Sequence, residues 1–402
     1  MNTEDVKNYV ERYLRRIFVE PINITVEDNK YIINNTLRYE IYNFWNKTDE
    51  ELLNDFKEFS FKEDYIGTIF FFLSGYWEYT HNNIKDEYER FPASESFSYK
   101  KDVLEEPVVD ILVESIRKEL DLNYKEDKPK AFLTHDIDNL GLPKGWKFLK
   151  SLGGDILKRK DIKLGIDRIK RKITNQDPWS VYNLIELHKK YGTKGTFFFM
   201  PDIQPENCPG GYDPFKNQGY LRELKKGIKT IDGRIGLHYD VRHLKEDRMK
   251  NDLEKLNQIF ETKIEYGRAH FLLFDITKSF DIYEKAGIKV DSTCSYADRV
   301  GFRFGTSKPF MPYNFKEKRD YNLLEIPLIV MEGSLQNPRY MNLSSKEGFE
   351  KIKELIQKIK KYKGTFTLLW HNSSFYTTEW KDWEWVYHET IKYLKENGFV
   401  FV

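Results

Sequence analysis

Two acidic residues that could bind a metal ion or transfer a proton stand two positions apart in the motif THDID, at residues 134–138. The motif continues the apolar pair Phe132-Leu133, which predicts a strand. Alternate side chains of a strand point to the same side, so the carboxylates of Asp136 and Asp138 should lie close together. Two such acids have unequal affinities for a proton unless a cation separates them. A metal ion that binds one carboxylate and leaves the other as a general base suits a hydrolase; an Asx-capped helical turn is the alternative, and it explains fewer of these residues.

Histidines that could complete a metal site follow two further apolar runs. His238 ends the run IGLH, and His243 stands five residues after it. In the run GRAHF, Arg268 and His270 stand two positions apart and therefore share one face of a strand. Imidazole is a frequent ligand of zinc and other transition metals, although a lone histidine at a strand end usually has a structural role. A buried arginine requires a carboxylate partner, and we expect Asp136 to be the partner of Arg268.

Two other loops could add side chains to the same site. The apolar run TFTLLW ends in His371 and Asn372. His371 stands where we expect a general acid, and Asn372 is a candidate for substrate binding. The loop DSTCSYADR is polar and aromatic, and it supplies Tyr296, Asp298 and Arg299 as further candidates for substrate binding. The alternative for this loop is that it only braces the mouth of the site.

The elements that position these residues alternate from about residue 128 onward between short apolar strands and longer amphipathic helices. Such alternation predicts parallel strands joined by crossover helices. Seven or eight strand–helix units fit a closed or distorted (β/α) barrel better than an open sheet, and barrels of this kind carry their active sites at the carboxyl ends of the strands. We expect strands near residues 131–134, 196–200, 235–237, 269–274, 289–292, 324–330, 365–370 and 399–402.

The first 125 residues have a mixed pattern that predicts a smaller α+β accessory domain. An amphipathic helix opens it, a strand pair spans about residues 22–39, and a helix covers about residues 108–120. The apolar run at 66–73 requires a partner surface. A polar stretch after residue 122 is the best boundary, so we predict an accessory domain at residues 1–125 and the barrel at residues 126–402.

Composition excludes several classes of function. The 402 residues carry 65 Lys and Arg against 64 Asp and Glu, and the net charge of +1 offers no broad surface for DNA, RNA or an anionic membrane. Cys208 and Cys294 have neither a disulfide nor a thiolate-zinc spacing.

The sequence has no signal peptide and no apolar run of about 20 residues, so we expect a cytoplasmic protein without a membrane span. The basic segment 150–172 is predicted to be a solvated helical insertion over the barrel mouth, with binding of a phosphate or sugar nucleotide as the alternative.

The ordered set THDID, GLH, RAH and LLWHN resembles the polysaccharide deacetylase (NodB homology) superfamily over about residues 128–402. The stretches GTFFF, RAHFLLFD and DSTCSYADRVGFRFGT are similar to a bacterial subgroup that has an extra N-terminal domain. The resemblance implies a distorted barrel that removes an acetyl group from an N-acetylated amino sugar in surface-glycan metabolism. It also implies the following roles: Asp136 as catalytic base, Asp138 and His238 as metal ligands, Arg268 as the residue that orients the base, and His371 as catalytic acid.

Alternatives stay open for the third metal ligand, the metal and the function. The superfamily's second histidine follows the first by four residues, whereas His243 follows His238 by five, which turns the two side chains apart on a regular helix. His270 stands where the superfamily usually has Pro, and we prefer it to His243 as third ligand. We expect a divalent metal ion, with zinc ahead of cobalt, nickel, manganese and iron. The alternative functions are a degenerate barrel that binds a glycan or a protein, and a glycosidase with two carboxylates.

Overall fold

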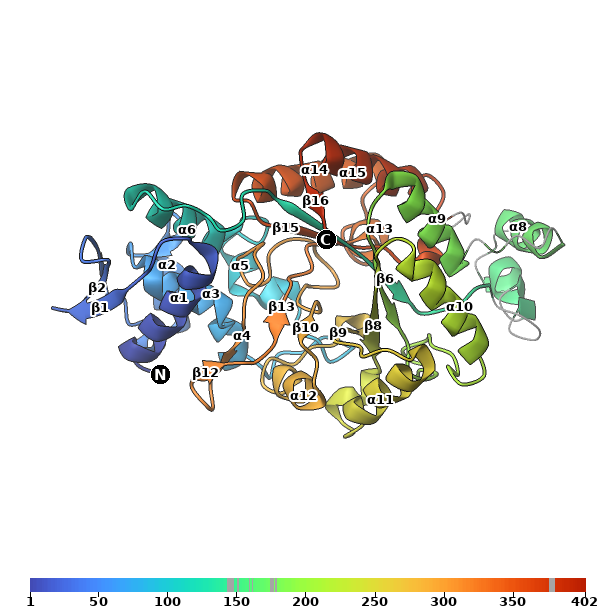
Figure 1. The fold of residues 1–402 in the computed structure, drawn as a ribbon, viewed down its shortest axis with the longest axis horizontal. Coiled ribbons are helices and arrows are strands. Elements are labelled where there is room, and N and C mark those ends of the chain that lie inside the picture. Colours follow the sequence, from blue (N-terminus) through green and yellow to red (C-terminus); the bar gives the residue numbers. More distant parts are fainter. Residues whose placement is uncertain are drawn as a thin grey trace.

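Strand pairing divides the chain into two parts (Figure 1). The computed structural model describes residues 1–142, 148, 149, 152–158, 160, 162–173, 177, 179–375 and 380–402. Up to residue 125 the paired strands run antiparallel, whereas from residue 130 onward one large sheet has only parallel pairs. One hydrophobic core extends through both parts, so they are packed against each other.

The N-terminal part is built around an apolar helix. In α3 (Tyr65–Leu73) every residue from Ile66 to Leu73 is buried. α1 (Thr3–Ile17) and α6 (Val108–Glu119) pack against it, and the barrel completes the cover, because the Phe70 ring lies 4.9 Å from the ring of Tyr313. The apolar run at 66–73 therefore has the partner surface that it requires.

Three strands stand beside these helices, where the sequence predicted a pair. β1 (Ile24–Glu27), β2 (Lys30–Ile33) and β3 (Leu37–Glu40) form an antiparallel sheet. The α+β class of this part is confirmed. Its other elements are η1 (Phe44–Asn46), α2 (Asp49–Asp55), β4 (Phe56–Lys57), β5 (Ser60–Phe61), α4 (Tyr76–Thr80), η2 (Ala93–Glu95) and α5 (Phe97–Lys100).

The C-terminal part is the predicted distorted (β/α) barrel. Its strands are β6 (Lys130–Ile137), β7 (Thr196–Phe199), β8 (Arg234–Tyr239), β9 (Tyr266–Ala269), β10 (Val290–Asp291), β13 (Leu324–Glu325), β14 (Val330–Met331), β15 (Thr365–Leu369) and β16 (Val400–Phe401). They lie in the order β13-β10-β9-β8-β7-β6-β15-β14, and β16 pairs with β6. The surrounding helices include α9 (Val181–Tyr191), α10 (Gln218–Lys229), α11 (Met249–Phe260), α12 (Ser279–Ala286), α13 (Glu332–Gln336), α14 (Ser345–Lys361) and α15 (Glu384–Glu396) (Figure 1).

The two edge strands of this sheet, β13 and β14, are neighbours in the chain but do not pair with each other, so the sheet is curled without being a closed ring of strands. Only residues 326–329 connect β13 at one edge to β14 at the other. The connection bonds to both sides of the seam: Ile326 N donates to Asp291 O at 2.9 Å, and Ile329 N donates to Thr367 O at 3.2 Å. The barrel is therefore distorted at one seam, where a connecting segment takes the place of a continuous strand pair.

Two predicted strands were misplaced. The strand predicted at 269–274 is β9, which ends at Ala269, and the turn η5 (His270–Leu272) follows it. The strand predicted at 324–330 is divided into β13 and β14 at the seam. In both cases some of the apolar residues pack in turns. An apolar run alone does not distinguish a strand from a buried turn.

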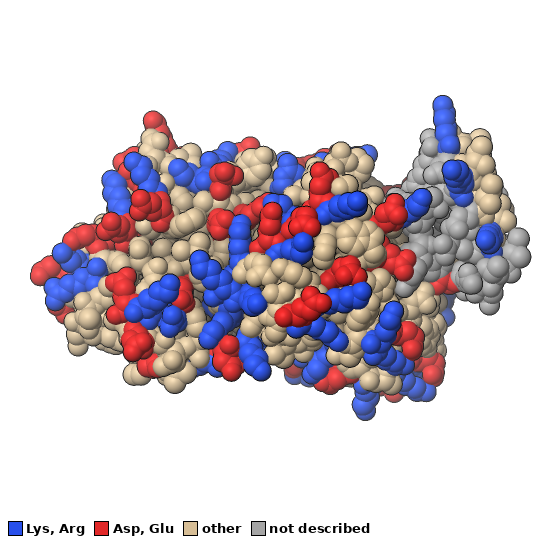
Figure 2. Space-filling view, turned by 90° about the horizontal axis from the view of Figure 1, so that it is seen from above, with Lys and Arg blue, Asp and Glu red and all other residues tan. Residues whose placement is uncertain are grey.

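Acidic and basic side chains alternate over the face of the molecule seen in Figure 2. This mixture agrees with the small net charge of the chain. None of the helices within the described part of the chain combines the length and the apolar character that crossing a bilayer requires.

Candidate metal centre and catalytic cavity

The sheet brings the predicted motifs to one edge. Asp136 lies near the carboxyl end of β6, His238 in β8 and Arg268 in β9, and His371 stands two residues beyond the end of β15. The carboxyl ends of parallel strands meet at the same edge of a barrel, so motifs far apart in the sequence converge there. His238 and Arg268 are paired neighbours in the sheet, whereas Asp136 reaches them from across the barrel.

Three side chains at this edge have the spacing of ligands to one metal ion. Asp138 Oδ1 lies 3.3 Å from His238 Nε2 and 3.4 Å from His270 Nδ1, and the two nitrogens lie 3.0 Å apart. A tetrahedral zinc site with bonds of about 2.0–2.1 Å places its ligand atoms about 3.3 Å from one another. The metal trio Asp138, His238 and His270 therefore fits a small tetrahedral cation with one position left for water or substrate.

The hydrogen bonds of the metal trio also suit a cation. His238 Nδ1 lies 3.0 Å from Arg268 O, and His270 Nε2 lies 3.3 Å from Pro209 O. With protons on these atoms, both rings donate to a backbone carbonyl and turn a bare nitrogen toward Asp138. Asp138 Oδ1 is buried and has no hydrogen-bond partner. The lone pairs of the two bare imidazole nitrogens and the carboxylate oxygen of Asp138 repel one another at these distances. A divalent cation between them would remove the repulsion.

The pKa values of the metal trio favour its metal-binding forms. Burial opposes ionisation of Asp138, but the positive charge of His270 in its protonated form, a hydrogen bond from His238 and the charge of His371 hold the pKa of Asp138 well below its usual range. Burial lowers the pKa of His270 to about 4, against the charge of Asp138. At neutral pH Asp138 is therefore ionised and His270 is neutral, as metal ligation requires.

Arg268 holds the second carboxylate in place. Arg268 is fully buried, and its Nη1 lies 3.2 Å from Asp136 Oδ1, the pairing that the sequence predicted. The same guanidinium donates to Thr134 Oγ1 at 2.6 Å and to Ser292 O and Oγ at 2.7 and 2.8 Å. The other oxygen of Asp136 lies 3.6 Å from His238 Nε2. Asp136 is thus fixed beside the metal trio without being one of its three ligand groups.

A second acid–histidine pair faces the metal trio. His371 Nδ1 lies 2.7 Å from Glu332 Oε1, and His371 Nε2 lies 3.9 Å from Asp138 Oδ2. Glu332 also accepts hydrogen bonds from the backbone N–H of His371 at 2.8 Å and from Ser374 Oγ at 2.7 Å. Burial opposes protonation of His371, yet the charge and hydrogen bond of Glu332, together with Asp138 and Asp136, raise its pKa to about 10. His371 is therefore a protonated imidazole that points toward the metal trio.

A cavity of about 270 Å³ opens beside these groups. Asp136, Asp138, His270 and His371 line it, and Arg90 reaches it from the N-terminal part. This volume is near the lower end of the range for small-molecule sites. Its apolar and aromatic wall comes from Phe271, Leu272, Ala297, Met331, Tyr340, Leu369 and Trp380.

The turn that carries His270 is strained and is held by the N-terminal part. Phe271 and Leu272 have φ angles of 59° and 51°, a left-handed conformation that residues other than glycine rarely adopt. Arg90 Nη1 donates to Phe271 O at 3.1 Å, and the Tyr88 ring packs 5.6 Å from the Phe271 ring. Arg90 and Glu332 were not among the residues predicted for the site, because each acts through contacts between segments that are far apart in the sequence.

His243 and Asn372 do not join the metal trio. The short turn η4 (Val241–Leu244) directs His243 toward α12, where its Nε2 lies 3.3 Å from the Tyr283 hydroxyl. The alternative third ligand is therefore placed away from Asp138. Asn372 Nδ2 donates to Asn139 O at 2.7 Å and to Trp179 O at 2.5 Å, so it links two loops, and it is not among the described residues that line the cavity.

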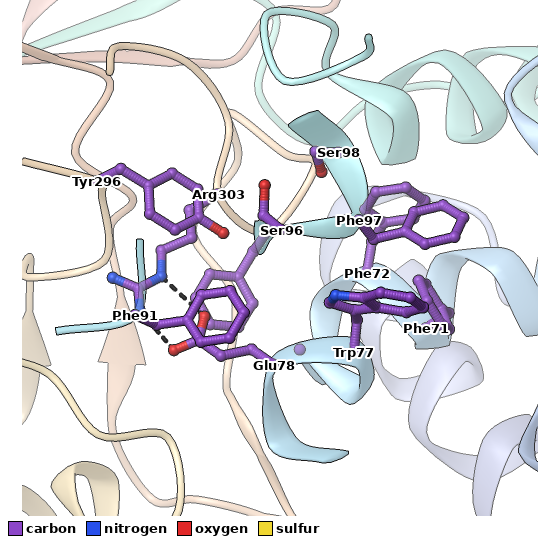
Figure 3. Close-up of a pocket in the computed structure, with 12 residues that line it drawn as sticks. Phe71, Phe72, Trp77, Glu78, Phe91, Ser96, Phe97, Ser98, Tyr296 and Arg303 are labelled. Atoms are coloured by element: carbon purple, nitrogen blue, oxygen red, sulfur yellow. Dashed lines mark hydrogen bonds and ion pairs between the residues drawn. The ribbon is translucent and has the colours of Figure 1, made fainter. Parts of the chain in front are cut away.

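Tyr296, Asp298 and Arg299 lie on a loop that packs toward the N-terminal part. Tyr296 is buried, and its ring lies 4.8 Å from the guanidinium carbon of Arg303 (Figure 3). Arg303 in turn pairs with Glu78 of α4 at 2.5 and 3.1 Å. Arg299 Nη1 donates to Asp298 O at 2.7 Å. Of the described residues that line the cavity, none is one of these three, although Ala297 of the same loop forms part of its wall.

Comparison with known proteins gives a different result for each part. The sequence profile of a family of unknown function, DUF7033, matches residues 3–125. No curated protein matches the chain.

Three of the solved structures to which the chain is similar each cover about two thirds of it. A Mycobacterium smegmatis protein assigned as a polysaccharide deacetylase is 13% identical over 67% of this chain and 85% of its own, with a TM-score of 0.43. The catalytic domain of a peptidoglycan N-acetylglucosamine deacetylase from Eubacterium rectale is 12% identical over 68% and 87%, with a TM-score of 0.33. A CE4 family pseudoenzyme from Bacillus anthracis is 15% identical over 68% and 63%, with a TM-score of 0.29. The chemistry of the present site therefore rests on its own geometry.

Proposed function

We propose that this protein is a metal-dependent hydrolase that removes the acetyl group from an N-acetylated amino sugar. The observation that carries the proposal is the arrangement of Asp138, His238 and His270, whose facing atoms are 3.0–3.4 Å apart around a buried, unpartnered carboxylate oxygen. A base and an acid, Asp136 and His371, stand beside the same carboxylate. A site that only binds a ligand has no need for this combination.

The metal trio would hold a divalent ion, and zinc suits two imidazoles and one carboxylate. When bound, such an ion supplies a positive charge that polarises a carbonyl group and makes a neighbouring water molecule more acidic. Asp136 would accept the proton of the attacking water, and Arg268 holds its carboxylate in position. The water oxygen would first bond to the acetyl carbon, the C–N bond would then break, and His371 would protonate the departing nitrogen. The products are acetate and a free amine.

The class of substrate follows from the size of the cavity and from the motif resemblance. A cavity of about 270 Å³ has room for about one sugar ring and its acetamido group. Aromatic side chains of Tyr340 and Trp380 on its wall can pack against a sugar ring. The motifs resemble those of polysaccharide deacetylases, and this resemblance is the reason for proposing an acetylated amino sugar as the substrate, in surface-glycan metabolism.

Metal analysis with matched histidine variants tests the proposal. We expect about one equivalent of zinc in the purified protein, lost in His238→Ala and in His270→Ala but retained in His243→Ala, because His243 faces Tyr283. No metal after reconstitution, or equal loss in all three variants, would contradict the proposed metal centre.

Acetate release from N-acetylglucosamine oligomers tests the catalytic roles. We expect Asp136→Asn to keep its metal and lose turnover, and Asp138→Ala to lose both. Equal metal loss in these two variants would show that the roles of the acids are assigned wrongly. A full complement of metal without acetate release from any acetylated sugar would favour a barrel that only binds glycans.

A further inference from the structure

A helical projection leaves the barrel at the edge that carries the cavity. It consists of η3 (Gly154–Lys158) and α8 (Ile162–Ile173) and lies at the end of the molecule opposite the N-terminal part (Figure 1). Both ends of the segment are fixed at the rim of the barrel, because Leu142 N lies 3.0 Å from both carboxylate oxygens of Asp177. Leu142 stands four residues after the metal ligand Asp138. The projection and the cavity therefore share one rim.

The projection exposes an apolar stripe. Ile162, Ile166 and Ile169 are 63%, 60% and 39% exposed, and their spacing of four and three residues places them on one face of α8. Six of the thirteen large apolar side chains that are exposed among the described residues fall between 149 and 169. Gly165 packs against Ile156 of η3, so the contact between the two helical segments covers only part of the stripe. Isolated apolar residues on a surface are ordinary, whereas a concentration such as this marks an interaction site.

The same segment concentrates positive charge. Residues 156–173 contain eight Lys or Arg and two Asp, a surplus of six on a chain whose net charge is only +1. Lys160, Lys163 and Lys170 are exposed, and Figure 2 shows Lys or Arg side chains on this projecting part. A helix with an apolar face and a lysine- and arginine-rich polar face is the pattern of helices that lie in the surface of an anionic bilayer.

We propose that α8 docks the protein onto an anionic lipid bilayer. The isoleucine face would enter the boundary between headgroups and acyl chains, and the exposed lysines Lys160, Lys163 and Lys170 would contact lipid phosphates. A second copy of the chain is a poorer occupant, because pairing of the same faces would bring two basic segments together. Single-stranded nucleic acid is also disfavoured, because residues 152–173 contain no aromatic side chain on which a base could stack.

Docking through α8 would bring the end of the barrel that carries this segment to the membrane surface. An acetylated sugar attached to a lipid is the form of substrate that such docking would favour. The inference rests on the projection alone and holds whether or not the proposed deacetylase activity is correct.

Co-sedimentation with lipid vesicles tests the inference on the full chain. We expect binding to vesicles of phosphatidylcholine with phosphatidylglycerol, little binding to phosphatidylcholine alone, and release at high salt. Ile166→Asn should weaken binding about tenfold, because one apolar anchor is lost without a change in charge. Val19→Asn is the matched control, since Val19 is 62% exposed on the N-terminal part, and it should bind like the wild type. Circular dichroism should show equal folding of the two variants.

Three results would overturn the inference. The first is no binding of the wild type to the anionic vesicles. The second is equal binding by the wild type and Ile166→Asn. The third is a dimer in solution that Ile166→Asn abolishes, which would assign the stripe to a second copy of the chain.

Discussion

Replacing Glu332 by Gln tests how the catalytic acid is controlled. The substitution keeps the shape of the side chain and one carbonyl oxygen, so the bonds from the His371 backbone N–H and from Ser374 can persist. It removes the negative charge from the 2.7 Å contact with His371 Nδ1. A hydrogen bond between charged partners contributes about 1.5–3 kcal/mol. If this hydrogen bond stabilises the transition state, its loss raises the activation free energy by that amount. Since about 1.4 kcal/mol corresponds to a factor of ten in rate, kcat should fall roughly 10- to 150-fold.

The pH dependence gives a second readout with a fixed sign. Glu332 raises the pKa of His371, so its removal lowers that pKa. His371 acts as an acid only while it is protonated, which is the case below its pKa. The alkaline limb of the kcat–pH profile should therefore move to lower pH in Glu332→Gln, while the metal content stays unchanged because Glu332 is not a ligand.

The assay is acetate release from an N-acetylglucosamine oligomer over a range of pH, with metal content measured on the same samples. Glu384→Gln is the matched control, because Glu384 also faces a histidine, His388, at 3.6 Å but is 37% exposed. The control should keep the wild-type kcat. A Glu332→Gln enzyme with wild-type kcat and an unmoved alkaline limb would refute the role of the Glu332–His371 pair.

Two further predictions concern the N-terminal part. Arg90→Ala should weaken metal binding about tenfold in a chelator competition, because it frees the strained turn next to His270; unchanged affinity would mean that the turn is stable by itself. Glu78→Ala should lower the free energy of unfolding by about 3–5 kcal/mol in a urea titration, because it leaves Arg303 buried without a counter-charge. Glu105→Ala, which breaks a more exposed ion pair, should cost less than about 1 kcal/mol, and equal costs would contradict the argument.

The convergence of the main site residues could be predicted because it depends on two regular rules. Alternate residues of a strand share a face, and the carboxyl ends of parallel strands meet at one edge of a barrel. These rules are sufficient to pair Asp136 with Arg268 and to bring His238 and His371 to the same edge. The fold class follows from the same alternation of strands and helices. The catalytic and metal-binding roles of these residues are a separate matter and remain proposals.

Local irregularity limited the remaining predictions. The strand before His270 ends at Ala269. Residues of the following turn have a left-handed backbone conformation although none of them is glycine, so the sequence did not indicate the turn. The loop with Tyr296 was a candidate for substrate binding, with bracing of the barrel mouth as the alternative. The Tyr296 ring packs on Arg303, which pairs with Glu78 across 225 residues of sequence. The basic character of residues 150–172 was visible in the sequence, whereas the exposed isoleucine stripe of α8 was not predicted. Local patterns do not contain such long-range information.

The N-terminal part is better understood as a structural component of the cavity than as a separate attachment. It covers barrel surface with α3, neutralises buried Arg303 with Glu78, and places Arg90 against the turn of His270. Removing it would expose apolar surface, leave one buried charge unpaired and release a strained turn, and each of these changes destabilises the folded barrel. A metal ligand on a strained turn needs such support, because a ligand atom must be held to within about 0.5 Å for tight binding. The geometry of the proposed metal centre thus depends on contacts made by both parts of the chain.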